Sequence, residues 1–354
     1  AQQELDVFWQ SFNELYAFFN LENVDWDATY QLANNAIDSE TTEEELVEVL
    51  IEMVAPLKDF HVSIENEALD VEFSVSRKME FDDIALNEFL EENKLSLPLD
   101  EQQFSAFEQY FEAAYDKFGD TIVSYMGDPS EIKTNDTETI AWAKTNDGLG
   151  YVFIETMDFL ELGGSEDYKQ NQANVSTTID EVITDFKDLK GIIFDLRINP
   201  GGDDEVGQMI MNRLIEERQL AYSKQARLGN SRTPIQEIYI EPHATLNYTG
   251  PVAMLVSSTT SSAAEIFSLA MKSRANTVFI GEATGGGLSD TLPRSLPSGT
   301  QYTLSNEFYI SVDGNEYEGV GIPVDIEQPF FRQAQRDLNR DFGLEKAVEW
   351  LTVQ

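Results

Sequence analysis

Two stretches near the start of the chain carry apolar residues at helical spacing. They run over residues 4–20 and 40–57, and in both the apolar positions recur with the period of a helix that buries one face. Ser39 or Thr41, each followed by glutamates, is expected to start the second helix, because a hydroxyl oxygen accepts a hydrogen bond from a free helix amide. The pattern predicts an N-terminal helical domain over residues 1–62.

The next segment mixes strand-like and helix-like patterns. Residues 61–77 alternate between apolar and polar, as a strand does when one of its faces is buried. Helical patterns follow at 83–94 and 101–118, and short β-like runs then continue to about residue 145. We therefore expect a mixed α+β region over residues 63–146.

Strand-like and helix-like patterns alternate through the remaining part of the chain. Uninterrupted apolar runs predict buried strands at 151–155, 191–196, 251–256 and 277–281, and helical spacing predicts helices at 176–187 and 263–273. Strands that alternate with helices are typical of a layered α/β core. We assign this core to residues 147–354.

Two of these predicted strands end in residues that can carry chemistry. The strand at 191–196 leads into Asn199-Pro-Gly-Gly202, a turn whose glycines leave backbone N–H groups unshielded. The strand at 251–256 leads into a run of hydroxyl residues and then a helix, so Ser262 lies at a strand-to-helix turn. An exposed serine beside amide donors for a developing oxyanion is what acyl transfer requires.

Ser262 also has a purely structural interpretation. Ser262-Ala-Ala-Glu265 fits a capping box, in which the serine caps a helix and the glutamate reaches back to it. We favour the nucleophile, because the serine follows a buried strand and accompanies the Asn-Pro-Gly-Gly turn. Ser257, Ser258 and Ser261 remain alternative nucleophiles.

Composition narrows the range of functions. The 354 residues are 42% hydrophobic, enough for a large core, and the formal net charge of −42 would repel nucleic acid and anionic membranes. We expect no nucleic-acid partner. The excess of acid has two explanations, which are solubility in a saline medium and an acidic site that selects basic substrates.

Several kinds of site and anchor are excluded or not expected. The absence of cysteine excludes disulfides, a thiol nucleophile and cysteine-bound metals. Asp203-Asp-Glu205 lacks the spacing of a calcium loop, so we expect solvated surface there, and neither a metal nor a cofactor. No apolar run reaches the roughly 18 residues of a membrane span, and Ala1-Gln-Gln-Glu fits the new end left by signal cleavage. We expect a periplasmic or secreted protein.

A nucleophilic serine needs a base, and the chain has two histidines. His61 closes the N-terminal helical segment, and His243 lies in a polar link before the strand that leads to Ser262. The ordinary pKa of imidazole, about 6.5, suits it to take the serine proton near neutrality and to return it to a leaving amine.

Five motifs indicate a family. Asp195-Leu-Arg-Ile-Asn-Pro-Gly-Gly202 is similar to a DLRxNxGG turn, and Ser262–Glu265 to an SAxE nucleophile motif. Leu57-Lys-Asp-Phe-His61 is similar to an LxDxH element, Val24-Asp-Trp-Asp27 to a VDW element, and Glu318-Gly-Val-Gly-Ile-Pro-Val-Asp325 to an element near the C-terminus. Together they resemble the tail-specific, or C-terminal processing, serine peptidases, whose relatives include the tricorn core protease and the interphotoreceptor retinoid-binding protein.

The resemblance implies a fold and a set of residue roles. It implies the crotonase-like spiral fold that is shared with the Clp protease subunit. It implies Ser262 as nucleophile and His61 as base. It further implies an oxyanion hole formed by the backbone amides of Ala263 and of Gly201 or Gly202.

The chain departs from the family at two positions. In members with a Ser-Lys dyad the lysine occupies the position of Gly287, and Lys272 lies roughly 15 Å along the predicted helix from Ser262, so a dyad is excluded. In the tricorn-like branch a glutamate supports the histidine through a serine. Glu318 matches that glutamate, but Phe60 replaces the serine. Glu318 is therefore expected to act directly, through water, or not at all.

Many relatives carry a PDZ domain in the region where this chain has the helical patterns 83–94 and 101–118. Gly148-Leu-Gly-Tyr151 mimics the carboxylate loop of a PDZ domain. It leads directly into Val152, however, so we interpret it as the entry to the first core strand. A preference for C-terminal tails therefore does not follow from the resemblance.

These observations predict a serine endopeptidase without a cofactor. It would hydrolyse unstructured peptides or protein tails through a serine nucleophile, a histidine base and a backbone oxyanion hole. The alternative is a non-catalytic ligand- or peptide-binding protein on the same fold, which the missing lysine and Phe60 favour.

Overall fold

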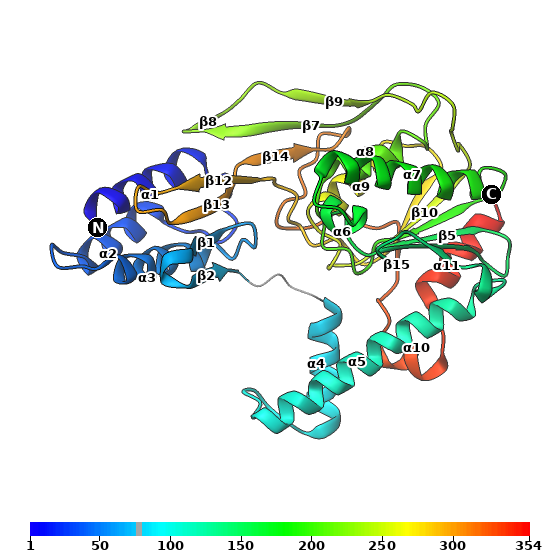
Figure 1. The fold of residues 1–354 in the computed structure, drawn as a ribbon, viewed down its shortest axis with the longest axis horizontal. Helices are drawn as coiled ribbons and strands as arrows, with labels where there is room; N and C mark the ends of the chain where they lie inside the picture. Colours follow the sequence, from blue (N-terminus) through cyan, green and yellow to red (C-terminus); the bar gives the residue numbers. More distant parts are fainter. Residues whose placement is uncertain (76–79) are drawn as a thin grey trace. The chain divides into compact units, whose positions relative to one another are not determined.

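The computed structural model describes residues 1–75 and 80–354, which divide into two compact units of interleaved segments (Figure 1). Unit 1 consists of Ala1–Arg77, Tyr222–Ile238 and Gly287–Gly319, and unit 2 of Lys78–Ala221, Tyr239–Gly286 and Val320–Gln354. The three consecutive domains predicted over 1–62, 63–146 and 147–354 differ from this division, because strands far apart in the sequence pair with each other.

Unit 1 begins with three helices, α1 (Gln2–Leu15), α2 (Trp26–Ala36) and α3 (Glu43–Val54). The α3 helix starts after Thr42, one residue beyond the predicted Thr41, and Thr42 forms a capping box with Glu45. Neither Ser39 nor Thr41 is therefore the cap, although a hydroxyl residue followed by glutamates does start the helix. The α2 helix was not predicted, because its sequence is rich in polar residues.

Aromatic side chains fill the core of unit 1. The rings of Phe8 and Phe12 lie 4.8 Å apart, Phe12 and Trp26 lie 5.2 Å apart, and Tyr302 closes on Phe8 at 4.8 Å, all between centroids. The four side chains are buried. Because large rings bury much apolar surface at low entropic cost, they join the helices to a strand that lies some 290 residues later in the sequence.

That strand belongs to a four-stranded antiparallel sheet in the order β12-β13-β1-β2. Its strands are β1 (Ser63–Asn66), β2 (Val71–Ser74), β12 (Thr291–Ser295) and β13 (Gln301–Ser305). The register pairs Ser63 with Thr303, which fixes the chain just after His61. Three further strands pair with β7 (Gln219–Leu228), and these are β8 (Ser231–Arg232), β9 (Gln236–Ile240) and β14 (Glu307–Ile310).

Unit 2 is built on a seven-stranded sheet in the order β15-β11-β10-β6-β5-β4-β3. The strands are β3 (Lys133–Thr134), β4 (Ile140–Lys144), β5 (Gly150–Ile154), β6 (Ile192–Asp195), β10 (Val252–Val256), β11 (Thr277–Gly281) and β15 (Ile326–Glu327). The central strands β5, β6, β10 and β11 are parallel, as their unbroken apolar runs indicate. The β5 strand begins at Gly150, so the interpretation of 148–151 as a strand entry is confirmed.

Helices cover both faces of this sheet (Figure 1). One face carries α7 (Tyr168–Phe186), α8 (Asp204–Met211) and α9 (Ala263–Lys272), preceded by the short α6 (Phe159–Gly163). The other face packs against α5 (Glu101–Ser124) and α11 (Phe342–Thr352), where Ala253 and Leu255 of β10 share a cluster with Phe118 and Leu344. The prediction of a layered α/β core is thus confirmed.

In the sequence, two helices follow β2 and precede the first strand of the core sheet. They are α4 (Glu80–Asn93) and α5, close to the predicted 83–94 and 101–118. The α4 helix is tied to α10 (Gln333–Leu338) by an ion pair between Glu88 and Arg336. The helical interpretation of this region is therefore confirmed.

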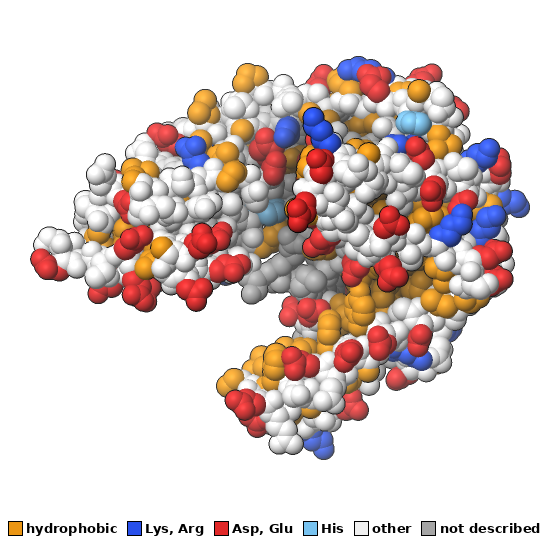
Figure 2. All heavy atoms as spheres, viewed as in Figure 1, with side chains coloured by type: hydrophobic (Ala, Val, Ile, Leu, Met, Phe, Trp, Pro, Cys, Tyr) orange, Lys and Arg blue, Asp and Glu red, His pale blue; other side chains and the backbone are white. Residues whose placement is uncertain are grey.

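The surface carries the excess of acid that the composition indicates. Figure 2 shows acidic side chains spread widely over the face in view, with basic side chains between them. Across residues 1–75 and 80–354, the helices lack the combination of length and apolar character that crossing a bilayer requires.

Candidate active site

Ser262 lies at a sharp turn between a buried strand and a helix. The β10 strand ends at Val256, and α9 begins at Ala263 directly after the serine. Ser262 has φ +52° and ψ −128°, a conformation dominated by glycine and strained for a residue with a side chain. A nucleophile held at a strained strand-to-helix turn is presented at the end of its strand.

The capping-box interpretation of Ser262 is wrong in this structure. The serine precedes the first residue of α9, but its side chain makes no capping hydrogen bond to the helix. Glu265, the expected partner, is fully buried and accepts hydrogen bonds from Thr284 Oγ1 at 2.5 Å and from the Gly286 N–H at 2.8 Å. The glutamate therefore holds the loop after β11.

The neighbouring hydroxyl groups tie the two strand exits together. Ser257 Oγ donates to the carbonyl of Arg197 at 2.5 Å, and Thr260 Oγ1 to the carbonyl of Leu196 at 2.7 Å. Ser261 Oγ donates to the carbonyl of Thr259 at 3.0 Å. The alternative nucleophiles Ser257 and Ser261 are thus buried and structural. Ser258, the third alternative, lacks the positive φ of Ser262.

The glycine-rich turn packs directly against the candidate nucleophile. Gly201 has φ +106°, and a Cβ built on it would lie 2.6 Å from Cβ of Ser262, so only glycine allows this approach. Asn199 fixes the turn, because its Oδ1 accepts from the Gly201 N–H at 2.8 Å while its Nδ2 donates to the carbonyl of Ile154 at 2.9 Å.

Two backbone amides beside the serine are open for an oxyanion. The Met157 N–H donates to the Gly201 carbonyl at 2.7 Å, and the Asp203 N–H donates to the Met157 carbonyl at 2.9 Å. These two bonds lie on either side of Gly202 and do not use its N–H. Among residues 1–75 and 80–354, the N–H groups of Gly202 and Ala263 have no acceptor. The amide of Gly201 is already used by Asn199, so Gly202 and Ala263 are the better pair of donors.

A buried ion network supports the turn from below. Arg197 donates through Nε and Nη2 to the two oxygens of Asp195 at 2.9 and 2.6 Å, and through Nη1 to Asp341 at 2.9 Å. Tyr151 adds a hydrogen bond to Asp195 at 2.8 Å. Burial by itself would lower the pKa of Arg197, but Asp195 and Asp341 outweigh burial and raise it. The hydrogen bonds thus satisfy the buried guanidinium and connect the turn to Asp341.

His61 lies in unit 1, in a turn that its backbone contacts define. The α3 helix runs into a short 3₁₀ turn, Ala55–Leu57, which ends at Lys58 with φ +51°. The His61 N–H then donates to Asp59 Oδ1 at 2.9 Å, and Thr303 Oγ1 donates to the His61 carbonyl at 2.6 Å. The residue as a whole is 7% exposed.

The carboxyl of Asp59 holds this turn, and its Oδ2 atom is buried. Burial raises the pKa of its carboxyl above the ordinary 3.8, and hydrogen bonds from Ser305, from the His61 N–H and from Tyr16 act in the opposite direction. A buried carboxyl that accepts a backbone N–H beside a candidate base positions that base.

Phe60, Gly287 and Glu318 also belong to unit 1. The ring of Phe60 packs on the imidazole of His61 with 4.3 Å between centroids, and Gly287 lies against the Cζ and Cε1 atoms of the same ring. Glu318 Oε2 accepts from the N–H groups of Leu288 and Ser289 at 2.8 and 2.9 Å. The glutamate therefore fixes the segment that follows Gly287.

His243, the other histidine, lies far from the nucleophile along unit 2. Its N–H donates to the carbonyl of Asn212, just beyond the last residue of α8. The α8 helix begins soon after the glycine-rich turn and is eight residues long, or roughly 12 Å. His243 is thus at the opposite end of α8 from Ser262 and is a poor base for it.

The structure groups the predicted site residues into two sets. Ser262, Gly201, Gly202 and Ala263 meet in unit 2, and His61 and Glu318 belong to unit 1. Sequence reasoning overlooked Asn199 and Asp59, although both stand inside the motifs that signalled the site. In the described residues no group of three or more acidic or histidine side chains is arranged to hold a metal ion.

Two family models match parts of the chain. The family model for peptidase family S41 matches residues 148–328, and that for the tricorn protease C1 domain matches residues 1–55. The carboxy-terminal processing protease CtpA of Bacillus subtilis (strain 168) is 27% identical over 141 residues, which cover 40% of this chain and 29% of that protease. The chain thus spans under a third of the curated relative.

Solved structures show the same fold along nearly the whole chain. A candidate peptidase from Parabacteroides merdae ATCC 43184 matches with a TM-score of 0.71 at 21% identity, covering 99% of this chain and 96% of that chain. Mature CPAF complexed with lactacystin matches with a TM-score of 0.64 at 11% identity, covering 99% and 98%. Since the S41 model spans more than half of the residues, the chain belongs to peptidase family S41.

Proposed function

We propose that this S41 family member is a serine endopeptidase that cleaves unstructured peptides. The observation that carries the proposal is the strained backbone of Ser262, held at φ +52° against Gly201 and beside the N–H groups of Gly202 and Ala263. Proteins keep such strain mainly where it serves a function. A serine beside two open amides supports acyl transfer.

The proposed reaction follows from these groups. Ser262 Oγ attacks the carbonyl carbon of the scissile bond while His61 takes the hydroxyl proton, and the N–H groups of Gly202 and Ala263 stabilise the oxyanion. The C–N bond then breaks, and His61 gives the proton to the leaving amine. A water molecule, deprotonated by His61, hydrolyses the ester and restores the serine.

We propose positioning roles for Asp59 and Glu318. The Asp59 carboxylate holds the backbone N–H of His61, and Glu318 holds the segment after Gly287 through two backbone N–H groups. Glu318 would thus support the imidazole through the loop that packs against Phe60. This differs from a relay through a serine, which Phe60 replaces.

The substrates are proposed to be flexible chains without a requirement for a free C-terminus. One relative is named a carboxy-terminal processing protease, but the middle region of this chain is built on α4 and α5 rather than on the short strands of a PDZ domain. A flexible substrate lets the scissile carbonyl reach the turn at Ser262.

A fluorophosphonate probe tests the nucleophile. We expect one adduct on Ser262, located by peptide mass spectrometry, that is lost in Ser262→Ala and forms more slowly in His61→Ala. Ser258→Ala and His243→Ala serve as matched controls, because each removes the same functional group from a neighbouring or alternative position. An adduct that persists in Ser262→Ala, or that slows equally in His61→Ala and His243→Ala, contradicts the assignment.

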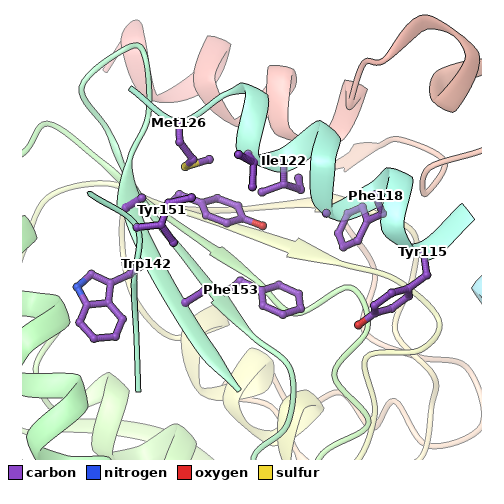
Figure 3. A pocket seen from close by; sticks show the side chains of 12 residues that line it. Tyr115, Phe118, Ile122, Met126, Trp142, Tyr151 and Phe153 are labelled. Atoms are coloured by element: carbon purple, nitrogen blue, oxygen red, sulfur yellow. The ribbon is translucent and has the colours of Figure 1, made fainter. Parts of the chain in front are cut away.

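One observation favours the second function, which is binding without catalysis. Between α5 and the strands β4 and β5 lies a pocket of about 220 Å³ with an almost entirely apolar lining, formed by side chains such as Phe118, Ile122 and Phe153 (Figure 3). Such a pocket suits an apolar ligand. If folded protein gives no adduct and retains an apolar dye displaceable by a fatty acid, the binding function replaces the peptidase.

A further inference from the structure

A second pocket of unit 2 adjoins the glycine-rich turn. It has a volume of about 510 Å³, and Pro200 and Thr259 form part of its wall. Pro200 directly precedes Gly201, and Thr259 stands three residues before Ser262 in the turn that leads to the nucleophile. A group bound in this pocket would therefore lie close to the reacting carbonyl.

Three carboxyl groups line this pocket. Asp82 comes from α4, Glu155 follows β5, and Glu161 belongs to α6. No lysine or arginine lines the pocket in the part of the chain that the structure describes. The three carboxyl groups thus give the lining a negative potential, which concentrates cations in a recess with low-dielectric walls.

Aromatic rings from α4 and α5 also line the pocket. Phe111 and Tyr115 come from α5, and Phe81 from α4 packs on Phe111 with 5.7 Å between centroids. The hydroxyl of Tyr115 donates to Glu155 at 3.5 Å. Aromatic faces beside carboxylates attract a guanidinium or ammonium group and also cover its aliphatic stem.

Thr259 gives an independent sign of a ligand. Its side chain is 1% exposed, and its Oγ1 has no hydrogen-bond partner within the described residues. A buried hydroxyl without a partner is unfavourable, and such groups are rare in folded proteins. A donor group of a bound ligand would satisfy it at the wall of the pocket.

We propose that this acidic-aromatic pocket binds the side chain of a lysine or arginine of the peptide substrate, next to the bond that Ser262 cleaves. The inference rests on the proposed function, since it assigns a substrate preference to the same site. It gives part of the chain's excess acid a direct role, one of the two explanations that the composition leaves open.

The test compares peptides that differ only in charge. Cleavage positions are first mapped by mass spectrometry on unfolded casein. Quenched-fluorescent peptides are then made with arginine or its neutral isostere citrulline at each position around a mapped bond. At one position we expect kcat/KM to be at least about tenfold higher for the arginine peptide. One charge-assisted hydrogen bond is strong enough to give a factor of this size.

Variants assign the preference to the pocket. In the double variant Asp82→Asn/Glu155→Gln the ratio of kcat/KM for the arginine peptide to kcat/KM for the citrulline peptide should fall below about threefold. Thr259→Val, which keeps the shape and removes the hydroxyl, should also lower the ratio. Glu166→Gln removes an exposed carboxyl that does not line the pocket and should leave the ratio unchanged.

The outcomes separate this inference from the proposed function. Fluorophosphonate labelling with no arginine preference, or with a preference that the double variant retains, overturns the inference and leaves the peptidase intact. If labelling occurs without cleavage, the inference is tested by how well each peptide slows the labelling of Ser262. The arginine peptide should slow labelling at a lower concentration than its citrulline counterpart, and equal concentrations would overturn the inference. Folded protein with neither adduct nor cleavage overturns the proposed function and the inference together.

Discussion

The ring of Phe60 fills the space in which a side chain at position 287 would begin. A Cβ built on Gly287 would lie 2.3 Å from Cζ and 2.4 Å from Cε1 of that ring, far inside van der Waals contact. The same ring packs on His61 with 4.3 Å between centroids. Phe60 and Gly287 are therefore a matched pair, and they exclude the lysine that this position carries in relatives with a Ser-Lys dyad.

Gly287→Ala is expected to destabilise the protein and to slow its reaction. The added methyl group must displace the ring of Phe60, which costs about 1–3 kcal/mol of unfolding free energy, as overpacking does. The displaced ring would also move the imidazole of His61. Urea unfolding measures the first effect, and the rate of fluorophosphonate labelling measures the second.

The double variant Phe60→Ala/Gly287→Ala checks the cause of this loss. Once the ring is gone, the methyl group at position 287 should fit. The double variant should therefore lose less unfolding free energy than the two single variants lose in sum, with a coupling energy of about 1 kcal/mol or more. Additive effects would show that the two residues do not compete for space.

Ser262→Gly and Ser262→Ala should differ in stability although both abolish labelling. Glycine adopts φ +52° and ψ −128° readily, whereas alanine keeps the strain. We expect the glycine variant to be more stable by about 1 kcal/mol, measured by chemical denaturation. An alanine variant of equal or greater stability would mean that the turn is not strained.

Asp59→Asn should change stability in a way that depends on pH. The raised pKa of the buried carboxyl means that its ionisation is less favourable in the folded state than in the unfolded state. The stability that the protonated carboxyl contributes is fully present at pH values below its ordinary pKa of 3.8. It is lost as the pH rises through the pKa that the carboxyl has in the folded state. The wild type should therefore lose stability relative to Asp59→Asn as the pH increases from 3.8.

Unfolding by urea at a series of pH values measures this difference. The exposed Asp147→Asn substitution gives the reference for a change of aspartate to asparagine outside the core. A difference between wild type and Asp59→Asn that is constant with pH, or that grows in favour of the wild type, would contradict the burial of an ionising carboxyl.

Arg197→Met should be among the most damaging single substitutions. It leaves Asp195 and Asp341 buried without their partner, which costs about 3–5 kcal/mol of unfolding free energy. Arg340 pairs with Glu345 at the surface, so Arg340→Met should have a far smaller effect. Thermal unfolding of both variants compares the two pairs. Similar losses would show that the buried network is not what stabilises the turn.

Local patterns in the sequence predicted much of the core and the strand-to-helix turn that holds Ser262. The strand β10 and the helix α9 lie where unbroken apolar residues and helical spacing place them, because both signals depend on neighbours along the chain. The turn between them identified Ser262. The choice of His61 depended on the resemblance to a family, since nothing local separates a catalytic histidine from a structural one.

Other features depend on distant partners and leave no local signal. Glu265 has the spacing of a capping box, but Thr284 and Gly286 compete successfully for its carboxylate. The assignment of the Gly287–Gly319 segment to unit 1 depends on strand pairing across the chain, which periodicity does not encode. The exported location expected from the chain's start remains a prediction.

The pairing of β1 with β13 also constrains the order in which the protein can form. Ser63 and its hydrogen-bond partner Thr303 are 240 residues apart, and a ribosome adding about 5–20 residues per second needs roughly 10–50 s to cover that interval. Throughout that time the turn that bears His61 lacks the strand that holds its carbonyl. The turn that bears His61 would thus acquire the contact that holds its carbonyl only after Thr303 has been synthesised.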